Sequence, residues 1–239
     1  DVGSGEFAAY LADVELQTQW NQKRTSAIYG RCFDAEHPFP ERFVRSLVER
    51  AHLRVAAQGM LDRAGLEGAV ATACTTIAAV ALFGDRCLVA SVGDSPVYLI
   101  SDQGLDKVTV DHTVQIASLR AGRPLSEVID DADTALGSAL GQLVMEDGDY
   151  VPAEVAVDLL TFRVFPGDIV LVCSDGIPDA FGREAERAIL AAAEGLVAGE
   201  VTDAGRLLAF VRRLVRRADE RGGRDNMTAV AVGIGDYGP

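Results

Sequence analysis

A short apolar segment of the chain is marked at both ends by residues that form turns. Ile169–Cys173 consists of five apolar residues with no polar position among them, which predicts a β-strand buried on both faces. Pro166–Asp168 before it is typical of a turn, and Pro178 after it prevents the strand from continuing. The segment Ser174–Gly176 therefore directly follows the strand, and Gly176 lets the backbone approach whatever the neighbouring carboxylate holds.

Two other apolar segments carry an aspartate close to a glycine at one end. Cys87–Val92 is followed by Gly93 and Asp94, and Met227–Gly233 is preceded by Asp225. We expect these strand-end aspartates to form one cluster, in which two unit charges about 4 Å apart repel by about 4 kcal/mol at an effective dielectric of 20. Such a cluster needs a counter-ion. Mg²⁺ and Mn²⁺ suit it because they bind through oxygen ligands alone.

Asp175 also has a simpler interpretation. An aspartate between a strand and a helical turn is a common helix cap, and Ile177–Phe181 has the composition of such a turn. The presence of three similar motifs in one chain favours the metal cluster over the cap alone.

The pattern of apolar residues in the rest of the chain predicts several helices, and strands that are paired by tight turns. Apolar residues at helical spacing predict helices at Phe7–Gln22, Glu41–Gln58, Val114–Ala121, Arg183–Gly195 and Asp203–Glu220. A short helix and turn are expected within Arg123–Gln142, which contains the run Ala135–Gly141. Further strands are expected at Ala69–Phe83, Arg86–Val92, Val97–Ile100 and Ala153–Val164. These elements predict one antiparallel α+β domain over residues 1–239.

The charge of the chain limits its partners. The formal net charge is −14 over 239 residues, which argues against nucleic acid and anionic membranes as partners. The arginines within Asp203–Glu220 are expected on a solvated helix face that forms ion pairs. His52 is expected to be a partly buried structural residue of its helix. His112 lies between a strand end and a helix cap, where it could bind a ligand, but a structural role is favoured.

Cysteine usage and hydropathy indicate a cytoplasmic protein. The four cysteines Cys32, Cys74, Cys87 and Cys173 have no Cys-x-x-Cys spacing, so we interpret them as reduced residues, mostly in the core, of a cytosolic protein. No apolar run approaches the length of a membrane span, and the acidic, glycine-bearing start does not have the pattern of a signal peptide.

In this order, the motifs resemble those of the metal-dependent type 2C (PPM) serine/threonine protein phosphatases. The segments that carry the resemblance are Ala71–Thr76, Val92–Ser95, Asp111–His112, Ala139–Gly141, Pro166–Asp168, Cys173–Gly176 and Gly223–Asn226. A Ser-Asp-Gly triplet alone is weak evidence, whereas the ordered set that ends in Gly-Arg-Asp-Asn is strong evidence.

The resemblance implies a four-layer αββα sandwich of two antiparallel sheets flanked by helix pairs. It also implies a binuclear Mg²⁺ or Mn²⁺ centre, where a metal-bridging hydroxide attacks phosphoserine or phosphothreonine. Asp175 and Asp225 would be the central metal ligands and the catalytic residues, and Asp94 would serve a third, weaker metal site. Asn226 would orient the last loop, with Gly93, Ser174 and Gly176 in support. The implied protein is a bacterial signalling phosphatase that acts on phosphorylated proteins.

The chain departs from the family pattern near its start. Asp1 and Val2 stand where the family has an Asp-Gly pair, so Val2 would supply the backbone carbonyl that the glycine normally contributes as a metal ligand. The family's earlier Asn-Glu-Asp motif and phosphate-binding arginine are not in the sequence, and Pro96 replaces a usual arginine. The sequence therefore leaves an alternative open: a catalytically inactive phosphatase-like domain that binds a partner or senses a metabolite.

Overall fold

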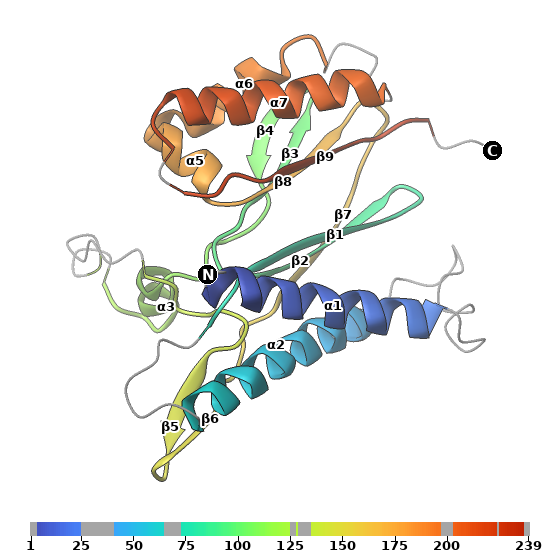
Figure 1. The fold of residues 1–239 in the computed structure, drawn as a ribbon. Helices are drawn as coiled ribbons and strands as arrows, with labels where there is room; N and C mark the ends of the chain where they lie inside the picture. Colours follow the sequence, from blue (N-terminus) through green and yellow to red (C-terminus); the bar gives the residue numbers. More distant parts are fainter. Residues whose placement is uncertain are drawn as a thin grey trace. The chain divides into compact units, whose positions relative to one another are not determined.

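The computed structural model of the chain describes residues 4–24, 41–64, 73–124, 128, 135–196, 203–223 and 225–236 (Figure 1). The helices are α1 (Ser4–Arg24), α2 (Glu41–Ala64), α3 (Val114–Arg120), α5 (Gly176–Phe181), α6 (Ala185–Ala193) and α7 (Ala204–Glu220), with the 3₁₀ turn η1 (Gly182–Glu184). The strands are β1 (Ile77–Phe83), β2 (Arg86–Val92), β3 (Val97–Ser101), β4 (Gly104–Lys107), β5 (Leu143–Glu146), β6 (Asp149–Pro152), β7 (Asp158–Arg163), β8 (Ile169–Cys173) and β9 (Ala229–Gly233). None of the described helices is both long and apolar enough for a membrane span.

The chain divides into two compact units. The first unit takes Asp1–Ile77, Ala90–Gly93 and Asp111–Leu159, and the second takes Ala78–Val89, Asp94–Val110 and Leu160–Pro239. The boundaries fall within β1, β2 and β7, which form a sheet in the order β1-β2-β7. The single domain predicted over residues 1–239 stays a prediction.

Helices α1 and α2 lie side by side in the first unit (Figure 1). Their buried residues, which pack together with Ala90 and Val92, are Ala8, Leu11 and Ala12 of α1 and Val48, Ala51 and Val55 of α2. Apolar residues three and four positions apart share one face of a helix. The helices predicted at Phe7–Gln22 and Glu41–Gln58 are therefore confirmed, with longer ends than the pattern indicated.

The second unit is built on an antiparallel sheet in the order β4-β3-β8-β9, with α5, α6 and α7 over one face (Figure 1). Successive side chains of β8 enter two different cores. Ile169 and Leu171 pack with Phe210 of α7, whereas Val170 packs with Cys87 of β2. Because side chains alternate along a strand, β8 is buried on both faces, as predicted. The predicted α+β class is confirmed by these helices and antiparallel sheets.

Two strands are shorter than the sequence indicated. The strand predicted at Ala69–Phe83 is β1, which begins at Ile77, and the strand predicted at Ala153–Val164 is β7, which begins at Asp158. Of the first predicted strand, residues 69–72 lie outside the described residues, and Thr75 forms only an isolated bridge with Leu140. Before β7, Ala156 donates its backbone N–H to the Ser138 hydroxyl instead of to a partner strand. Strand propensity alone does not form a strand, because it depends on packing against a partner.

The short helix expected within Arg123–Gln142 does not lie at Ala135–Gly141. Leu136 and Leu140 instead form isolated β-bridges with Thr113 and Thr75. Gly137 also donates its backbone N–H to the His112 carbonyl over 2.6 Å. These partners satisfy the backbone polar groups without a helix, and the glycines of this segment disfavour the helical alternative.

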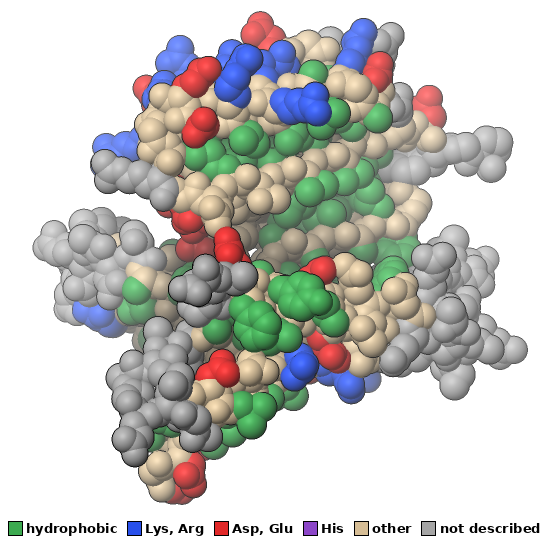
Figure 2. Space-filling view, viewed as in Figure 1, with side chains coloured by type: hydrophobic (Ala, Val, Ile, Leu, Met, Phe, Trp, Pro, Cys, Tyr) green, Lys and Arg blue, Asp and Glu red, His purple; other side chains and the backbone are tan. Residues whose placement is uncertain are grey.

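Lys and Arg side chains gather over α7 (Figure 2). One of the ion pairs predicted for this helix joins Arg216 to Glu220 over 3.7 Å. Arg213 differs from the prediction because it is half-buried and donates from Nε and Nη2 to the Ala192 carbonyl, over 3.0 and 2.6 Å. It thus satisfies a carbonyl at the end of α6 rather than facing solvent.

Candidate metal centre

Asp175 stands at the end of β8 and at the start of α5. Its Oδ1 accepts a 2.8 Å hydrogen bond from the Gly176 N–H, and the residue is the N-cap of α5. The simpler interpretation of Asp175 as a cap is therefore correct, but it does not use the whole side chain. Within the described residues the other carboxylate oxygen accepts no hydrogen bond, and the half-buried position leaves it accessible to a ligand.

Asp225 is brought beside Asp175 by the pairing of β8 with β9. Ser174 donates its backbone N–H to the Thr228 carbonyl over 3.0 Å, and its hydroxyl donates to the Asn226 carbonyl over 2.9 Å. The same hydroxyl accepts from the Thr228 N–H over 3.1 Å. One serine side chain therefore holds the segment that contains Asp225 against the end of β8.

Gly176 permits this close approach. A Cβ atom at Gly176 would lie 2.7 Å from the Asn226 carbonyl oxygen and 3.3 Å from the Asp225 Cβ. Its neighbour Asp225 is exposed, and its Oδ1 accepts from the Asn226 N–H over 2.7 Å. Like Asp175, Asp225 keeps a second oxygen without a hydrogen bond in the described part of the chain.

Asp94 lies at the same end of the sheet. It comes shortly before β3, whose first residue Val97 pairs with Val172 near the end of β8. The Cys173 N–H also donates to the Pro96 carbonyl over 3.1 Å. Nevertheless, among the residues that the structure describes, no three His, Cys, Asp or Glu side chains lie close enough together to hold one metal ion.

The structure thus places the backbone segments that carry two of the five predicted ligands, Asp175 and Asp225, side by side. Asp94 stays a predicted ligand at the same sheet end, and Asp1 and Val2 lie outside the described residues.

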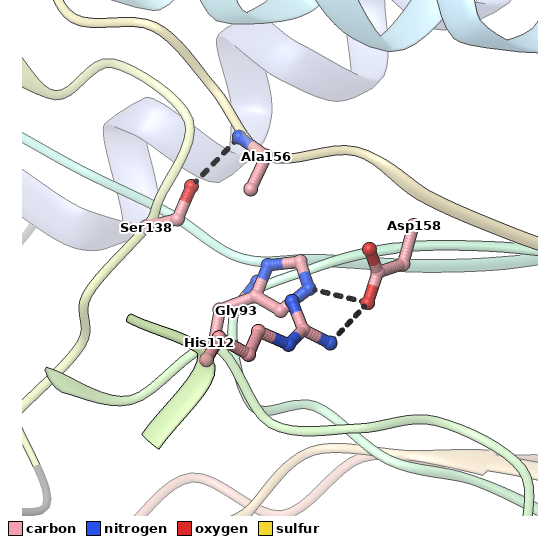
Figure 3. A network of polar contacts seen from close by, with 6 residues as sticks. Gly93, His112, Ser138, Ala156 and Asp158 are labelled. Atoms are coloured by element: carbon pink, nitrogen blue, oxygen red, sulfur yellow. Dashed lines mark hydrogen bonds and ion pairs between the residues drawn. The ribbon is translucent and has the colours of Figure 1, made fainter. Parts of the chain in front are cut away.

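Sequence reasoning missed a polar network in the first unit that holds Gly93, the residue before Asp94 (Figure 3). The His112 N–H donates to the Gly93 carbonyl over 2.9 Å, and the Gly93 N–H donates to His112 Nδ1 over 3.2 Å. Gly93 has φ of +100°, and a Cβ there would overlap the side chain of Thr76. The position therefore requires glycine for its conformation and for space.

The second ring nitrogen of His112 contacts a carboxylate. His112 Nε2 lies 3.0 Å from Asp158 Oδ2, which also accepts from Arg120 over 3.2 Å (Figure 3). Because Nδ1 accepts from Gly93, the ring proton is on Nε2, directed at Asp158. Burial raises the pKa of Asp158, but the hydrogen bonds from His112 and Arg120, together with the positive charge of Arg120, outweigh it and leave the pKa below its usual value. The feature of the sequence that could have indicated this network is the Asp111–His112 pair, which follows β4.

His52 and the described cysteines have structural roles, as expected. His52 is buried, accepts from the Gly141 N–H over 3.1 Å, and has its pKa lowered mainly by burial. Cys74, Cys87 and Cys173 are all free thiols. Burial raises the pKa of Cys87 to about 11 and that of Cys173 to about 12, so neither is ionised near neutral pH. Cys32 lies outside the described residues.

Sequence comparison relates the chain to bacterial phosphatases. The serine/threonine protein phosphatase PstP of Mycobacterium tuberculosis is 31% identical over 163 residues, which is 68% of this chain and 28% of that protein. The serine/threonine phosphatase stp of Listeria monocytogenes is 25% identical over 233 residues, which is 96% of this chain and 79% of that protein. No protein-family model matches the chain.

Solved structures agree with the sequence relatives. The structure of M. tuberculosis PstP covers 98% of this chain at a TM-score of 0.67 and 24% identity, with 83% of that structure covered. The PPM Ser-Thr phosphatase MsPP of Mycobacterium smegmatis covers 96% at a TM-score of 0.63 and 28% identity, with 83% of its own length covered. The chain belongs to the type 2C (PPM) serine/threonine phosphatase family.

A third solved structure of this PPM family carries metal. The catalytic domain of PstP in complex with two manganese ions covers 97% of the chain at a TM-score of 0.63 and 25% identity, with 82% of that domain covered. The likenesses confirm the predicted α+β sandwich as the fold class. The PPM-family chain spans only 28% of the length of the whole mycobacterial PstP.

The residues of the PPM-family chain that meet at this sheet end suit a hard divalent cation. Asp175 and Asp225 offer carboxylate oxygens, and each carboxylate has one oxygen that the described chain does not use. Mg²⁺ and Mn²⁺ prefer such oxygen ligands over nitrogen or sulfur. The pair fits as part of a metal site.

Proposed function

We propose that this chain is a metal-dependent protein serine/threonine phosphatase that uses Mn²⁺ or Mg²⁺. The observation that carries the proposal is that the segments carrying Asp175 and Asp225 lie side by side at one sheet end, where Ser174 and Gly176 hold them. Family membership supports it, as do the names of the PstP and stp relatives and the manganese complex of the PstP catalytic domain.

Each residue of the site has a proposed role. Asp175 and Asp225 hold the cations, Asp94 contributes to a further site at the same sheet end, and Asn226 orients the last loop. When bound, the divalent cations would lower the pKa of a metal-bound water toward neutrality and would neutralise negative charge on the phosphoryl group. Ser174 and Gly176 act on the site only through the backbone that they hold. Asp1 and Val2, outside the described residues, stay predicted ligands.

The proposed substrates are proteins that carry phosphoserine or phosphothreonine. The exposed position of Asp225 supports this class, because a side chain of a folded protein can reach a carboxylate that stands at the surface. We propose a cytoplasmic site of action from the free thiols and the acidic composition.

One observation favours the second candidate function, an inactive phosphatase-like domain that binds a partner or senses a metabolite. In the part of the chain that the structure describes, no group of three potential metal ligands is found. A site that retains two ligands binds metal more weakly than a complete one, and a weakly bound cation supports little catalysis.

Hydrolysis of p-nitrophenyl phosphate and of a phosphothreonine peptide by the purified chain separates these candidates. We expect Mn²⁺-dependent turnover that falls about 100-fold in Asp175→Asn and in Asp225→Asn. Asp102→Asn changes a carboxylate to an amide in an exposed turn and serves as the matched control. Turnover equal in all variants would contradict the assigned roles, and absence of turnover at any Mn²⁺ concentration would favour the inactive domain.

Calorimetric titration with Mn²⁺ tests the metal site without any turnover. Asp175→Asn and Asp225→Asn should each lower the affinity by at least about tenfold, because each removes one anionic ligand. Unchanged binding in Asp225→Asn would remove that residue from the site, whatever the activity assay shows.

A further inference from the structure

A groove of about 490 Å³ runs between α7 and the segment that contains Asp225. Its apolar lining comes from Val211, Val215 and Met227, and its charged lining includes Arg212 and Arg216. Asp225 itself lines the groove, so the groove is continuous with the candidate metal centre. In Figure 2 a strip of apolar side chains lies directly below the basic side chains of α7.

The arginines of α7 and its C-cap differ in how they are used. Arg213 is occupied by the Ala192 carbonyl, and Arg221 lies 2.9 Å from Glu184. Arg212 makes no ion pair within the described part of the chain, and Arg216 has only the exposed 3.7 Å contact with Glu220. Exposed pairs of this kind contribute little. The two arginines of the groove are therefore available to a ligand.

The charge of this segment is opposite to that of the whole chain. Ala204–Arg221 contains six arginines and two acidic residues, whereas the chain has a net charge of −14. The net negative charge of the chain repels acidic polypeptides. The basic segment attracts them locally, so an acidic polypeptide is expected to approach beside the candidate centre.

We infer that this groove docks acidic residues that flank the phosphorylated residue of the substrate, an inference that rests on the proposed phosphatase function. The occupant is an extended, acidic segment of the phosphoprotein. Arg212 and Arg216 are one helical turn apart, about 6 Å along the axis, which is close to the spacing of about 6.6 Å between alternate side chains of an extended chain. Carboxylates at two alternate positions therefore match the two guanidinium groups.

The acidic members of the groove do not cancel this charge. Asp225 is proposed to hold a cation, and a bound cation offsets its charge at that end. Asp219 is the other carboxylate in the lining. With a cation present, the lining has two arginines against one unneutralised aspartate. The preference for acidic substrates should therefore strengthen with Mn²⁺.

Paired phosphothreonine peptides test the inference. One carries glutamates at two alternate positions beside the phosphothreonine, and the other carries glutamines there. We expect kcat/KM of the wild-type chain to be about fivefold higher for the acidic peptide at low salt, and the preference to shrink as salt is added. Arg212→Glu with Arg216→Glu should abolish or reverse the preference.

The matched control is Arg217→Glu, which makes the same change on the same helix. Arg217 lines a separate groove with Phe181 and Arg187, so its replacement should leave the ratio of the two peptides unchanged. The milder pair Arg212→Gln and Arg216→Gln keeps the test valid if the charge reversal unfolds the chain. An equal loss of preference in Arg217→Glu would overturn the groove assignment.

Binding of a labelled, non-hydrolysable phosphonate version of the acidic peptide gives a readout that needs no turnover. Fluorescence anisotropy should show tighter binding than for the glutamine peptide, and the difference should vanish in the double arginine variant. A wild-type chain that hydrolyses p-nitrophenyl phosphate but treats both peptides alike would overturn the docking inference and leave the phosphatase proposal intact. Arginine-dependent peptide binding by a chain without hydrolysis would support the docking groove while the phosphatase proposal fails.

Discussion

Two strand ends in this molecule carry the same combination of glycine and aspartate but are held in different ways. After β8, Gly176 faces the backbone of the segment before β9, which carries Asp225. After β2, Gly93 is held between Thr76 and the buried ring of His112. At the end of β8, contacts close to the backbone hold the two segments, and each aspartate keeps a carboxylate oxygen accessible. At the end of β2, the side chains of Thr76 and His112 surround Gly93, which is buried.

The difference indicates which position serves ligand binding and which serves stability. Where two backbone segments pack directly against each other, their side chains are not needed to hold the segments together, so those side chains stay available to a ligand. A buried histidine that bonds a glycine in both directions fixes one backbone conformation instead. We therefore expect changes at Gly93 to lower the free energy of unfolding most, and changes at Gly176 to lower the metal affinity most.

Gly93→Ala should have the largest effect on stability. A side chain at φ of +100° is strained, and its Cβ overlaps Thr76, so the free energy of unfolding should fall by about 4 kcal/mol. Urea denaturation measures this loss. Gly84→Ala is the control: φ there is +53°, but nothing lies within 4 Å of an added Cβ, and a loss of about 1 kcal/mol is expected. Equal losses would mean that space around Gly93 is unimportant.

Gly176→Ala should lower the free energy of unfolding less, by about 2 kcal/mol, because the added Cβ is too close to the Asn226 carbonyl and the Asp225 Cβ but the backbone at Gly176 is not in the left-handed region. It should nevertheless reduce Mn²⁺ affinity by about tenfold in calorimetry, since the Asp225 segment must move. Gly182→Ala, at φ of +54° with open space around it, is the control and should leave metal affinity unchanged. The comparison fails if Gly93→Ala weakens Mn²⁺ binding more than Gly176→Ala does.

Replacements of His112 separate its two contacts. His112→Leu removes both and leaves the Gly93 N–H without its acceptor, for an expected loss of about 2 kcal/mol in the free energy of unfolding. His112→Asn can present a carbonyl oxygen close to the position of Nδ1, so it should lose only about 1 kcal/mol. Thermal and urea unfolding measure both variants. Identical losses would show that the bond to Gly93 contributes nothing.

Asp158 should add a small pH dependence to the stability of the first unit. Its pKa is below the unfolded value, with the opposing effect of burial outweighed by His112 and Arg120. The stabilisation is therefore complete above about pH 4 and is lost as the pH falls through the folded-state pKa. Comparison of the wild type with Asp158→Asn between pH 3 and pH 7 should show the gap in unfolding free energy closing at low pH. A constant gap would exclude this ionisation as the cause.

Local patterns in the sequence predicted the elements with strong periodicity. The helices at the start of the chain, the hairpin of β1 and β2, and β8 with its turn all follow from residues that are near neighbours in sequence. Thr113 and Asp203 cap α3 and α7 for the same reason. The strand starts at Ile77 and Asp158 did not follow, because a strand begins where a partner begins, and the partner is remote in sequence.

The sequence by itself determined the candidate ligands Asp94, Asp175 and Asp225, because each carboxylate stands at the end of an apolar strand. Only the tertiary structure decided which of them meet. The pairing of β8 with β9 and the space left by Gly176 join Asp175 to Asp225. The roles of His112 and of the α7 arginines were also decided by tertiary structure, because a polar side chain takes its role from the partners that folding places around it.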